Sequence, residues 1–392
     1  MLHIGIDARL IHYRRGMGTV VYSLINEWVR FITTPCDDAP IPFRLTLYVD
    51  SARAVTAAAP FANDHVSVRQ FGPAFYPLWE QWLLPRQVLK DEVDVLYCPA
   101  NTAPIFLPAP IKLALTIHDV MYLLPQGQLP TSPSLYQRLG RHYRRWVVPK
   151  AARRANLIVT DSQFSRRDIL QYLGRSLSTS ADAIQVVTLA AAAEYGPQLP
   201  ENVALGLAQL KVRPPYILGL GAIDPRKNTT RLIEAFAQLE NRSQKLVITG
   251  LDPAAQAYFG KLAQQYGLNL GNDVILLGFV SERELAALYA GATLLLYPSL
   301  YEGFGLPVLE AMACGTPVIT SNTSSIPEIA GEAALLIDPT DITAMSNAMQ
   351  RLIDAPSLRQ QLIKSGWVRA SQFNWQFSAK LMLTLLSKVV GL

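Results

Sequence analysis

The segment from Tyr301 to Gly315, YEGFGLPVLEAMACG, is the most informative stretch of the chain. Gly303 and Gly305 permit a tight turn and a close approach of the backbone to a ligand. Pro307 suits the first turn of a helix, and Gly315 suits the position just after its end. The free N–H groups at the start of such a helix favour an anion, so the segment predicts a phosphate-binding turn.

Two carboxylates flank this turn. Glu302 lies in the loop before the expected helix, and Glu310 lies about one turn inside it. At this separation the pair suits sugar hydroxyls beside a bound phosphate. Each glutamate taken alone also has a simpler interpretation, because Glu310 can complement the helix dipole and Glu302 can be a solvated loop residue.

Short apolar runs alternate with longer amphipathic segments on both sides of this motif. In Thr229–Leu239, for example, the apolar residues fall on one helical face. Strands that alternate with helices predict an α/β fold with doubly wound parallel sheets. The expected strands are His3–Ile6, Leu45–Val49, Asp94–Tyr97, Leu113–Ile117, Leu157–Thr160, Ile184–Val187, Tyr216–Leu220, Lys245–Thr249, Val274–Leu277, Thr293–Tyr297, Pro317–Thr320 and Ala334–Ile337.

The strand candidates form two sets of six, and a Pro- and Ala-containing break from Ala190 to Pro215 separates them. We therefore expect two Rossmann-like domains, residues 1–195 and 196–374, joined by a linker. A last helix, residues 375–392, has no strand after it. It either caps the second domain or returns to the first.

Composition excludes several classes of protein. The chain has 392 residues, of which 50% are hydrophobic and 17% charged, so a large core is possible and intrinsic disorder is not expected. Three cysteines exclude a disulfide scaffold, and five scattered histidines show no metal-binding spacing. We expect no bound metal, because there is also no Asp-any-Asp motif. Without a signal-like start or a long apolar run, a cytoplasmic location is expected.

Charge is divided unevenly. Residues 1–190 carry 20 Lys/Arg and 14 Asp/Glu, whereas residues 191–392 carry 15 and 16. The segment Arg138–Arg154 holds seven basic residues, no acidic residue, and apolar residues at nearly helical spacing. One interpretation is a helix on an anionic membrane surface, facing a lipid-linked acceptor. The other is a solvated Arg-rich helix; no motif indicates nucleic-acid binding.

The string from Glu302 to Glu310 resembles the signature of retaining glycosyltransferases of family four. The resemblance extends in order over Met1–Gly18, Leu115–Asp119, Ala155–Asp168, Leu218–Asn228, Leu277–Leu288 and Thr293–Asp338. It implies the GT-B architecture, in which two Rossmann-like domains face each other across a cleft. The run Pro225-Arg226-Lys227-Asn228 is most similar to the bacterial mannosyltransferase-like branch.

The resemblance also implies roles for residues of the second half. Glu302 would act on the donor sugar and Glu310 would hold the ribose, while Arg226 and Lys227 would neutralise the departing diphosphate. Many relatives have an arginine where this chain has Ala222, so Arg226 is a candidate replacement. The remaining candidates for the donor site in this half are Gly303, Phe304, Gly305, Leu306 and, near the base, Phe279.

Other interpretations of these segments stay open. Asp224-Pro225 can simply set a turn, with Asn228 capping the next helix. The turn at Phe279 leads to Ser281 and Glu284, which are spaced as a capping box.

In the first half, the resemblance places Gly16 and Gly18 close to the donor, although an ordinary strand-to-helix turn explains them equally well. His118 ends an expected strand, and the family has a histidine here that contacts the donor sugar. Asp119 would orient His118 or cap the following turn. Ser162 looks like the start of a helix and is a weaker candidate on the acceptor side.

The function that follows is transfer of a hexosyl group, with retention, from a nucleotide diphosphate sugar to a hydroxyl of a glycan or lipid-linked acceptor. The branch resemblance favours GDP-mannose and polysaccharide biosynthesis, with no other cofactor. UDP- or dTDP-linked donors, a nucleotide-sugar 2-epimerase or hydrolase, and a non-catalytic nucleotide-sugar-binding protein are the alternatives. A dehydrogenase is disfavoured, because Gly219 and Gly221 lack the third glycine of the dinucleotide fingerprint.

Overall fold

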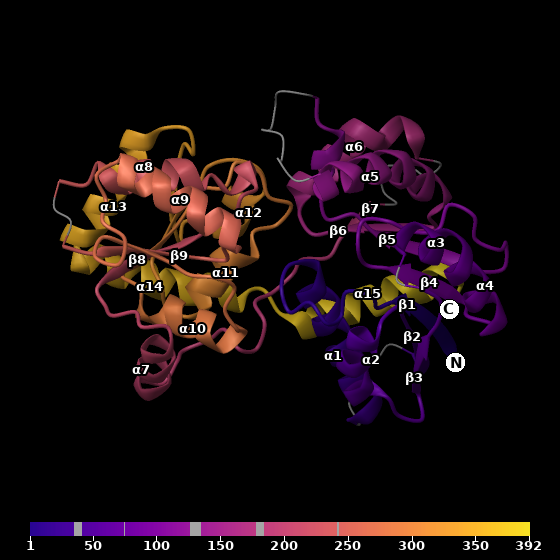
Figure 1. The fold of residues 1–392 in the computed structure, drawn as a ribbon. Coiled ribbons are helices and arrows are strands. Elements are labelled where there is room, and N and C mark those ends of the chain that lie inside the picture. Colours follow the sequence, from indigo (N-terminus) through magenta and orange to yellow (C-terminus); the bar gives the residue numbers. More distant parts are fainter. Residues whose placement is uncertain (35–40, 74, 126–134, 178–183, 241–242) are drawn as a thin grey trace. The chain divides into compact units, whose positions relative to one another are not determined.

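The computed structural model describes the chain except for residues 35–40, 74, 126–134, 178–183 and 241–242. The chain forms two compact units (Figure 1). The first is built mainly from Met1–Leu124, Leu139–Leu189 and Asn374–Leu392, and the second mainly from Ala190–Phe373. Each unit has its own parallel sheet and its own helices, so the predicted α/β class is confirmed.

The sheet of the first unit has, in the described residues, seven parallel strands in the order β3-β2-β1-β4-β5-β6-β7. β1 (Leu2–Asp7) is buried along its whole length, as a central strand covered on both faces should be. The edge strand β3 (Val66–Gln70) was not expected, because it is short and half exposed. The other strands are β2 (Phe43–Val49), β4 (Val95–Cys98), β5 (Lys112–Thr116), β6 (Leu157–Thr160) and β7 (Ile184–Val186).

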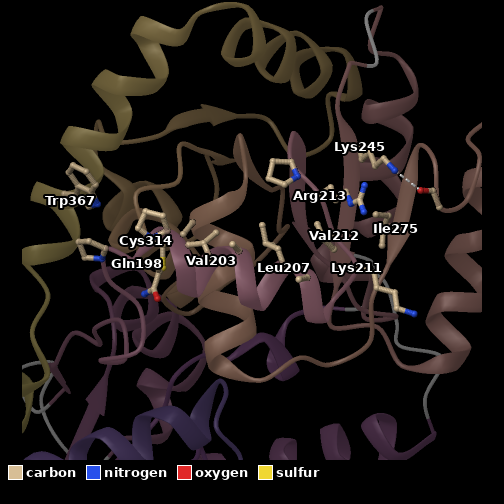
Figure 2. A pocket seen from close by; sticks show the side chains of 17 residues that line it. Gln198, Val203, Leu207, Lys211, Val212, Arg213, Lys245, Ile275, Cys314 and Trp367 are labelled. Atoms are coloured by element: carbon tan, nitrogen blue, oxygen red, sulfur yellow. Dashed lines mark hydrogen bonds between the residues drawn. The ribbon is translucent and has the colours of Figure 1, made fainter.

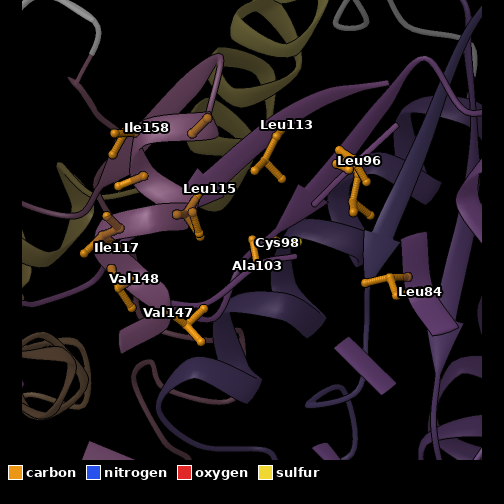
Figure 3. Packing of buried hydrophobic residues seen from close by; sticks show 14 of the residues in the cluster. Leu84, Leu96, Cys98, Ala103, Leu113, Leu115, Ile117, Val147, Val148 and Ile158 are labelled. Carbon is orange, nitrogen blue, oxygen red and sulfur yellow. The ribbon is translucent and has the colours of Figure 1, made fainter. Parts of the chain in front are cut away.

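One face of this sheet forms a large apolar core with the helices α4 (Leu84–Lys90), α5 (Leu135–Arg154) and α6 (Gln163–Leu173) (Figure 3). Alternate residues of β5, Leu113 and Leu115, point into it and meet Val147 and Val148 of α5. The helices of this unit are α1 (Met17–Thr33), α2 (Ala52–Ala58), α3 (Tyr76–Leu78), the π-helical turn η2 (Trp79–Leu83), α4 (Leu84–Lys90), α5 (Leu135–Arg154), α6 (Gln163–Leu173) and α15 (Trp375–Val389).

The last helix, α15, belongs to the first unit. It packs against α1, where the fully buried Trp28 donates a hydrogen bond from Nε1 to the carbonyl of Ala379 at 2.9 Å. Ser378 Oγ donates to the carbonyl of Thr188 at 2.6 Å. The sequence left open whether this helix caps the second domain or returns to the first, and in the structure it returns to the first unit.

The described part of the second unit contains six parallel strands in the order β10-β9-β8-β11-β12-β13. These strands are β8 (Tyr216–Leu220), β9 (Lys245–Thr249), β10 (Val274–Leu276), β11 (Leu294–Tyr297), β12 (Val318–Ser321) and β13 (Leu335–Ile337). The helices are α7 (Pro200–Gln209), α8 (Thr229–Ala237), α9 (Pro253–Gln265), α10 (Glu282–Gly291), α11 (Leu306–Ala313), α12 (Ile326–Ala330), α13 (Ile342–Asp354) and α14 (Pro356–Ser371).

The break from Ala190 to Pro215 contains a helix that the sequence did not predict. This stretch contains α7, which packs closely against α10 within the second unit. Gly206 makes the approach possible, because a Cβ atom there would lie 2.6 Å from the Cβ of Ala287. Because α7 contains many small residues, its apolar face was not recognised in the sequence.

The strand order positions the loops that carry chemistry. β8 lies between β9 and β11, so the connections after β8 and β11 leave on opposite sides of the sheet. In doubly wound sheets, ligands bind beside the carboxyl ends of the strands at such a switch point. The segments around Arg226–Lys227 and Glu302 follow these two strands.

Candidate active site

The loop after β8 is shaped by local hydrogen bonds. Asp224 accepts from the backbone N–H of Arg226 at 3.0 Å and begins the short 3-10 turn Pro225–Lys227. Asn228 occupies the cap position of α8 in the left-handed conformation, with φ of 56°, but its side chain makes no capping bond. Its amide instead donates to the carbonyls of Pro298 and Pro339 at 3.0 and 2.6 Å. Asn228 therefore fixes this loop against the one that follows β11.

Glu302 is the centre of a compact polar cluster. Its Oε1 accepts hydrogen bonds from Lys227 Nζ at 2.7 Å, Tyr297 Oη at 2.6 Å and Ser299 Oγ at 2.6 Å. Lys227 Nζ also donates to Tyr297 Oη at 2.6 Å. Within the described part of the chain, Oε2 of Glu302 accepts no hydrogen bond, and the side chain keeps 14% exposure. One carboxylate oxygen is thus anchored and the other can receive a ligand.

The surroundings of Glu302 also fix its charge. Burial by itself raises the pKa of this carboxyl, but the charges of Lys227 and Arg226 and the hydrogen bonds from Lys227 and Ser299 lower it to about 2. Glu302 is therefore ionised at any physiological pH.

The pKa of Glu310 is shifted in the opposite direction. It lies in α11 and accepts a hydrogen bond on Oε2 from Tyr289 Oη at 3.0 Å. Burial raises the pKa of Glu310 to about 7, while the bond from Tyr289 acts in the lowering direction. This carboxyl is close to half protonated at neutral pH, so it can accept from a ligand hydroxyl or donate to one.

The start of α11 agrees with the predicted turn. Gly305 precedes the helix with φ of 114°, and no side chain caps the first turn. Gly315 follows the helix with φ of 78°. Ser325 Oγ donates to the carbonyls of Glu302 and Phe304, which holds the loop in place. A helix start without a side-chain cap retains its affinity for an anion.

Two predicted donor-site residues have their side chains turned to the protein. The ring of Phe304 is buried and lies edge-on to Phe373, with centroids 5.8 Å apart. The guanidinium of Arg226 donates to both carboxylate oxygens of Asp224, with Nη2 2.6 Å from Oδ2. At the neighbouring Ala222, the backbone N–H donates to Thr229 Oγ1. Arg226 thus forms an ion pair with Asp224 in its own turn, whereas Lys227 forms one with Glu302.

The remaining candidates of the second unit lie on loops and helix starts. Leu306 is the first residue of α11, and Gly303 lies in the loop before it. Phe279 is exposed and follows β10. Ser281 and Glu284 form the predicted capping box at the start of α10, so both interpretations of this turn remain compatible with the structure.

In the first unit, Gly16 and Gly18 form the turn that opens α1. Gly16 has φ of 55°, and a Cβ atom on Gly18 would lie 1.8 Å from the carbonyl oxygen of Tyr13. Both positions therefore need glycine for backbone reasons alone. Ser162 caps α6, as expected, by accepting from the N–H of Ser165.

His118 is buried, and both of its ring nitrogens have partners. Nδ1 lies 2.6 Å from Asp161 Oδ2, and Nε2 donates to the carbonyl of Pro99 at 2.7 Å. Burial lowers the pKa of His118, but the Asp161 carboxylate outweighs it and the net shift is upward. Asp119 accepts from the N–H of Met121, so it caps the turn and Asp161 orients the histidine.

Sequence reasoning missed four residues of these clusters. Tyr297 and Ser299 precede Glu302 by five and three positions, and polar side chains at the end of a buried strand are the signal that could have identified them. Asp161 gives the same signal, because it directly follows the expected strand Leu157–Thr160. Tyr289 lies within α10, 21 residues from Glu310, and the sequence offers no signal for it.

A surface cavity of about 1300 Å³ lies elsewhere in the second unit (Figure 2). Val203 and Leu207 of α7 line it, together with the cations Lys211, Arg213 and Lys245. Lys245 is the first residue of β9, so these cations lie at the amino ends of the strands, away from Glu302.

The described residues contain no group of three or more His, Cys, Asp or Glu side chains arranged to hold a metal ion. None of their helices is both long and apolar enough to cross a bilayer.

Comparison with known proteins adds the family. The model of a family described as glycosyl transferases group 1 matches residues 208–367. O-antigen chain mannosyltransferase B of Escherichia coli is 32% identical over 293 residues, which are 74% of this chain and 73% of that protein. Serotype-specific mannosyltransferase WbdA of Escherichia coli is 27% identical over 72% of this chain, but this chain spans only 35% of that protein.

Solved structures support the fold. Anabaena Alr3699/HepE, crystallised in complex with UDP and glucose, superposes with a TM-score of 0.74 at 20% identity, covering 99% of this chain and 100% of that one. At this level of identity the likeness concerns the fold alone, and it confirms the expected GT-B class.

Proposed function

Since this chain belongs to the glycosyl transferases of group 1, we propose that it transfers mannose from GDP-mannose to a hydroxyl of a glycan or lipid-linked acceptor. The transfer retains the anomeric configuration and needs no bound metal. Support for mannose comes from the two relatives from Escherichia coli, both of which are named mannosyltransferases.

The observation that carries this proposal is the arrangement at Glu302. Lys227, Tyr297 and Ser299 hold Oε1 and keep the carboxylate ionised, while Oε2 stays available. A fixed negative charge of this kind binds donor-sugar hydroxyls and stabilises positive charge that develops at the anomeric carbon. Because the charge is preorganised, little reorganisation is needed in the transition state.

The departing diphosphate is negatively charged and needs positive charge beside it. Lys227 and the uncapped start of α11 supply it, since both are at the carboxyl edge of the same sheet. Glu310 holds the ribose through its carboxylate oxygens. The acceptor hydroxyl attacks from the face that the diphosphate leaves. Its oxygen bonds to the anomeric carbon as the bond from that carbon to the diphosphate oxygen breaks, and its proton passes to the departing diphosphate, which gives retention without a covalent intermediate.

The acceptor is presented at the inner face of a membrane. Support comes from α5, in which Arg138–Arg154 carry seven basic residues and no acidic one. The exposed cations on this helix suit an anionic bilayer surface.

Kinetics of two variants test the site. Glu302→Gln and Lys227→Ala should each lower kcat by at least about a hundredfold, as removal of preorganised charge does elsewhere. Glu332→Gln and Lys364→Ala change the same side-chain types at exposed positions of the second unit and should leave kcat unchanged. Near-normal turnover in both site variants would contradict the assignment.

Donor and mechanism need separate measurements. A thermal-shift screen with GDP, UDP, dTDP and ADP should give the largest rise in Tm with GDP, because a ligand that binds only the folded state stabilises it. NMR of the product should show the donor's anomeric configuration, with the rate unchanged by EDTA. Epimerised sugar from donor alone, or binding without turnover, would point to the alternatives instead.

A further inference from the structure

We infer that three segments of the first unit form one surface that inserts aromatic rings into the headgroup region of an anionic bilayer. We call it the aromatic–basic surface. Its members are the stripe Leu78, Trp82, Arg86 and Leu89, the loop residue Phe106, and Trp146 with Lys150 on α5. The inference deepens the membrane contact proposed for α5 and rests on that proposal.

The first segment runs through α3, η2 and α4. Leu78, Trp82 and Arg86 follow each other at intervals of four residues, so they lie along one side of this helical stretch. Trp82 is 58% exposed, and the guanidinium of Arg86 lies 5.2 Å from its ring centroid. An indole exposed beside a cation suits the boundary between headgroups and acyl chains.

The other two segments each carry one exposed aromatic ring as well. Phe106 is 82% exposed in the loop between β4 and β5. Trp146 of α5 is 55% exposed, and Lys150 Nζ lies 3.7 Å from its ring centroid. Both side chains leave large apolar area in water, which is a cost unless something covers them.

Gln81 holds the three segments together. Its Nε2 donates to the carbonyl of Ala103 at 3.2 Å and to Tyr143 Oη at 3.1 Å, and its Oε1 accepts from the N–H of Ile105 at 2.9 Å. Trp82 follows Gln81 and Phe106 follows Ile105 in the chain.

The ring of Trp146 is connected to Gln81 through α5. Trp146 lies three residues beyond Tyr143 on α5 and is therefore its neighbour on the helix surface. Each exposed ring is thus within one residue or one helical turn of a Gln81 contact. Gln81 therefore ties together the three segments that carry the exposed rings.

Charge selects the partner. Residues 75–90, 99–111 and 138–154 together contain nine Lys or Arg and a single acidic residue, Glu80. Glu80 is fully buried and accepts hydrogen bonds from Thr102 Oγ1 and Tyr143 Oη, so it adds no negative charge to the surface. Protruding rings beside cations, with no exposed acid in the three segments, match an anionic bilayer.

Vesicle flotation with the full chain tests the surface. Wild type should float with phosphatidylglycerol vesicles and not with phosphatidylcholine vesicles. Trp82→Ala/Phe106→Ala should reduce the bound fraction at least tenfold without changing the Tm. Tyr258→Ala/Phe377→Ala removes two exposed rings outside the three segments and should bind like wild type.

Three outcomes would overturn the inference. They are absence of wild-type flotation, equal binding by the Trp82/Phe106 variant, and a change in that variant's oligomeric state without vesicles, which would assign the surface to a second copy. Transfer to a water-soluble acceptor should be unchanged in the Trp82/Phe106 variant. Because that assay contains no membrane, failure of the proposed transferase activity would be distinguishable from failure of membrane binding.

Discussion

At the scale of single residues, two glutamates eight positions apart have pKa values that are shifted in opposite directions. Glu302 faces Lys227 and hydroxyl donors, and its pKa falls to about 2. Glu310 is buried in α11 with the phenol of Tyr289, and its pKa rises to about 7. The sequence indicated both carboxylates but not this difference, because the difference arises from the burial of Glu310 and from the contact of Glu302 with Lys227, which is 75 residues earlier in the chain.

The raised pKa of Glu310 predicts how stability depends on pH. Between pH 4.5 and 7 the folded chain keeps a proton on Glu310 that the unfolded chain has released, so this group lowers stability as the pH rises. The effect amounts to about 3 kcal/mol over that range. In Glu310→Gln the fall should be absent, whereas Glu332→Gln should behave like wild type. Urea denaturation at several pH values would check this, and parallel curves for wild type and Glu310→Gln would contradict it.

Tyr297 predicts a positioning effect on catalysis. In Tyr297→Phe, Lys227 and Ser299 still hold Oε1 of Glu302, so the carboxylate stays ionised but is less restrained. Loss of one hydrogen bond to a charged group costs about 1.5–3 kcal/mol, so we expect kcat to fall about 10- to 100-fold. The fall should be smaller than in Glu302→Gln and the pH profile unchanged. Tyr258→Phe, at an exposed position, is the matched control.

At the scale of elements, the sequence was most informative where apolar runs are continuous. Leu157–Thr160, Tyr216–Leu220 and Lys245–Thr249 were predicted with the bounds that the structure has. It failed at β3, which is a short, half-exposed edge strand, and at α7, whose packing depends on small residues. In the candidate site it supplied Lys227 and Glu302 but not Asp161, whose contact with His118 arises from tertiary folding.

The tight turn at the start of α1 predicts that one methyl group added at Gly18 strongly lowers the stability of the fold. A Cβ atom on Gly18 would meet the backbone of Tyr13 and Leu10, which cannot move without opening the turn. Gly18→Ala should therefore lower the free energy of unfolding by several kcal/mol, above the range of about 0.5–3 kcal/mol typical of point substitutions. Gly174→Ala has no neighbour within 4 Å and should be close to neutral. Chemical denaturation of both variants measures the difference, and equal stabilities would contradict the steric argument.

At the scale of the whole molecule, the two units differ in how the chain builds them. The second unit is mainly one continuous run, Ala190–Phe373, whereas the first needs segments from both ends of the described chain. We predict that residues 190–373 fold alone, with a cooperative thermal transition and native-like circular dichroism. Removal of residues 375–392 should instead unfold the first unit, because Trp28 and α1 lose their cover. A non-cooperative transition of the 190–373 fragment would contradict this.

The return of α15 to the first unit has a consequence during synthesis. The indole of Trp28 bonds to Ala379, which is 351 residues later in the chain. At ribosomal speeds of about 5–20 residues per second, that partner appears roughly 20–70 seconds after Trp28. Throughout this interval the surface of α1 that α15 will cover is exposed on the nascent chain, while the later unit can already complete its own sheet. The half of the protein that is made first is therefore the half that finishes folding last.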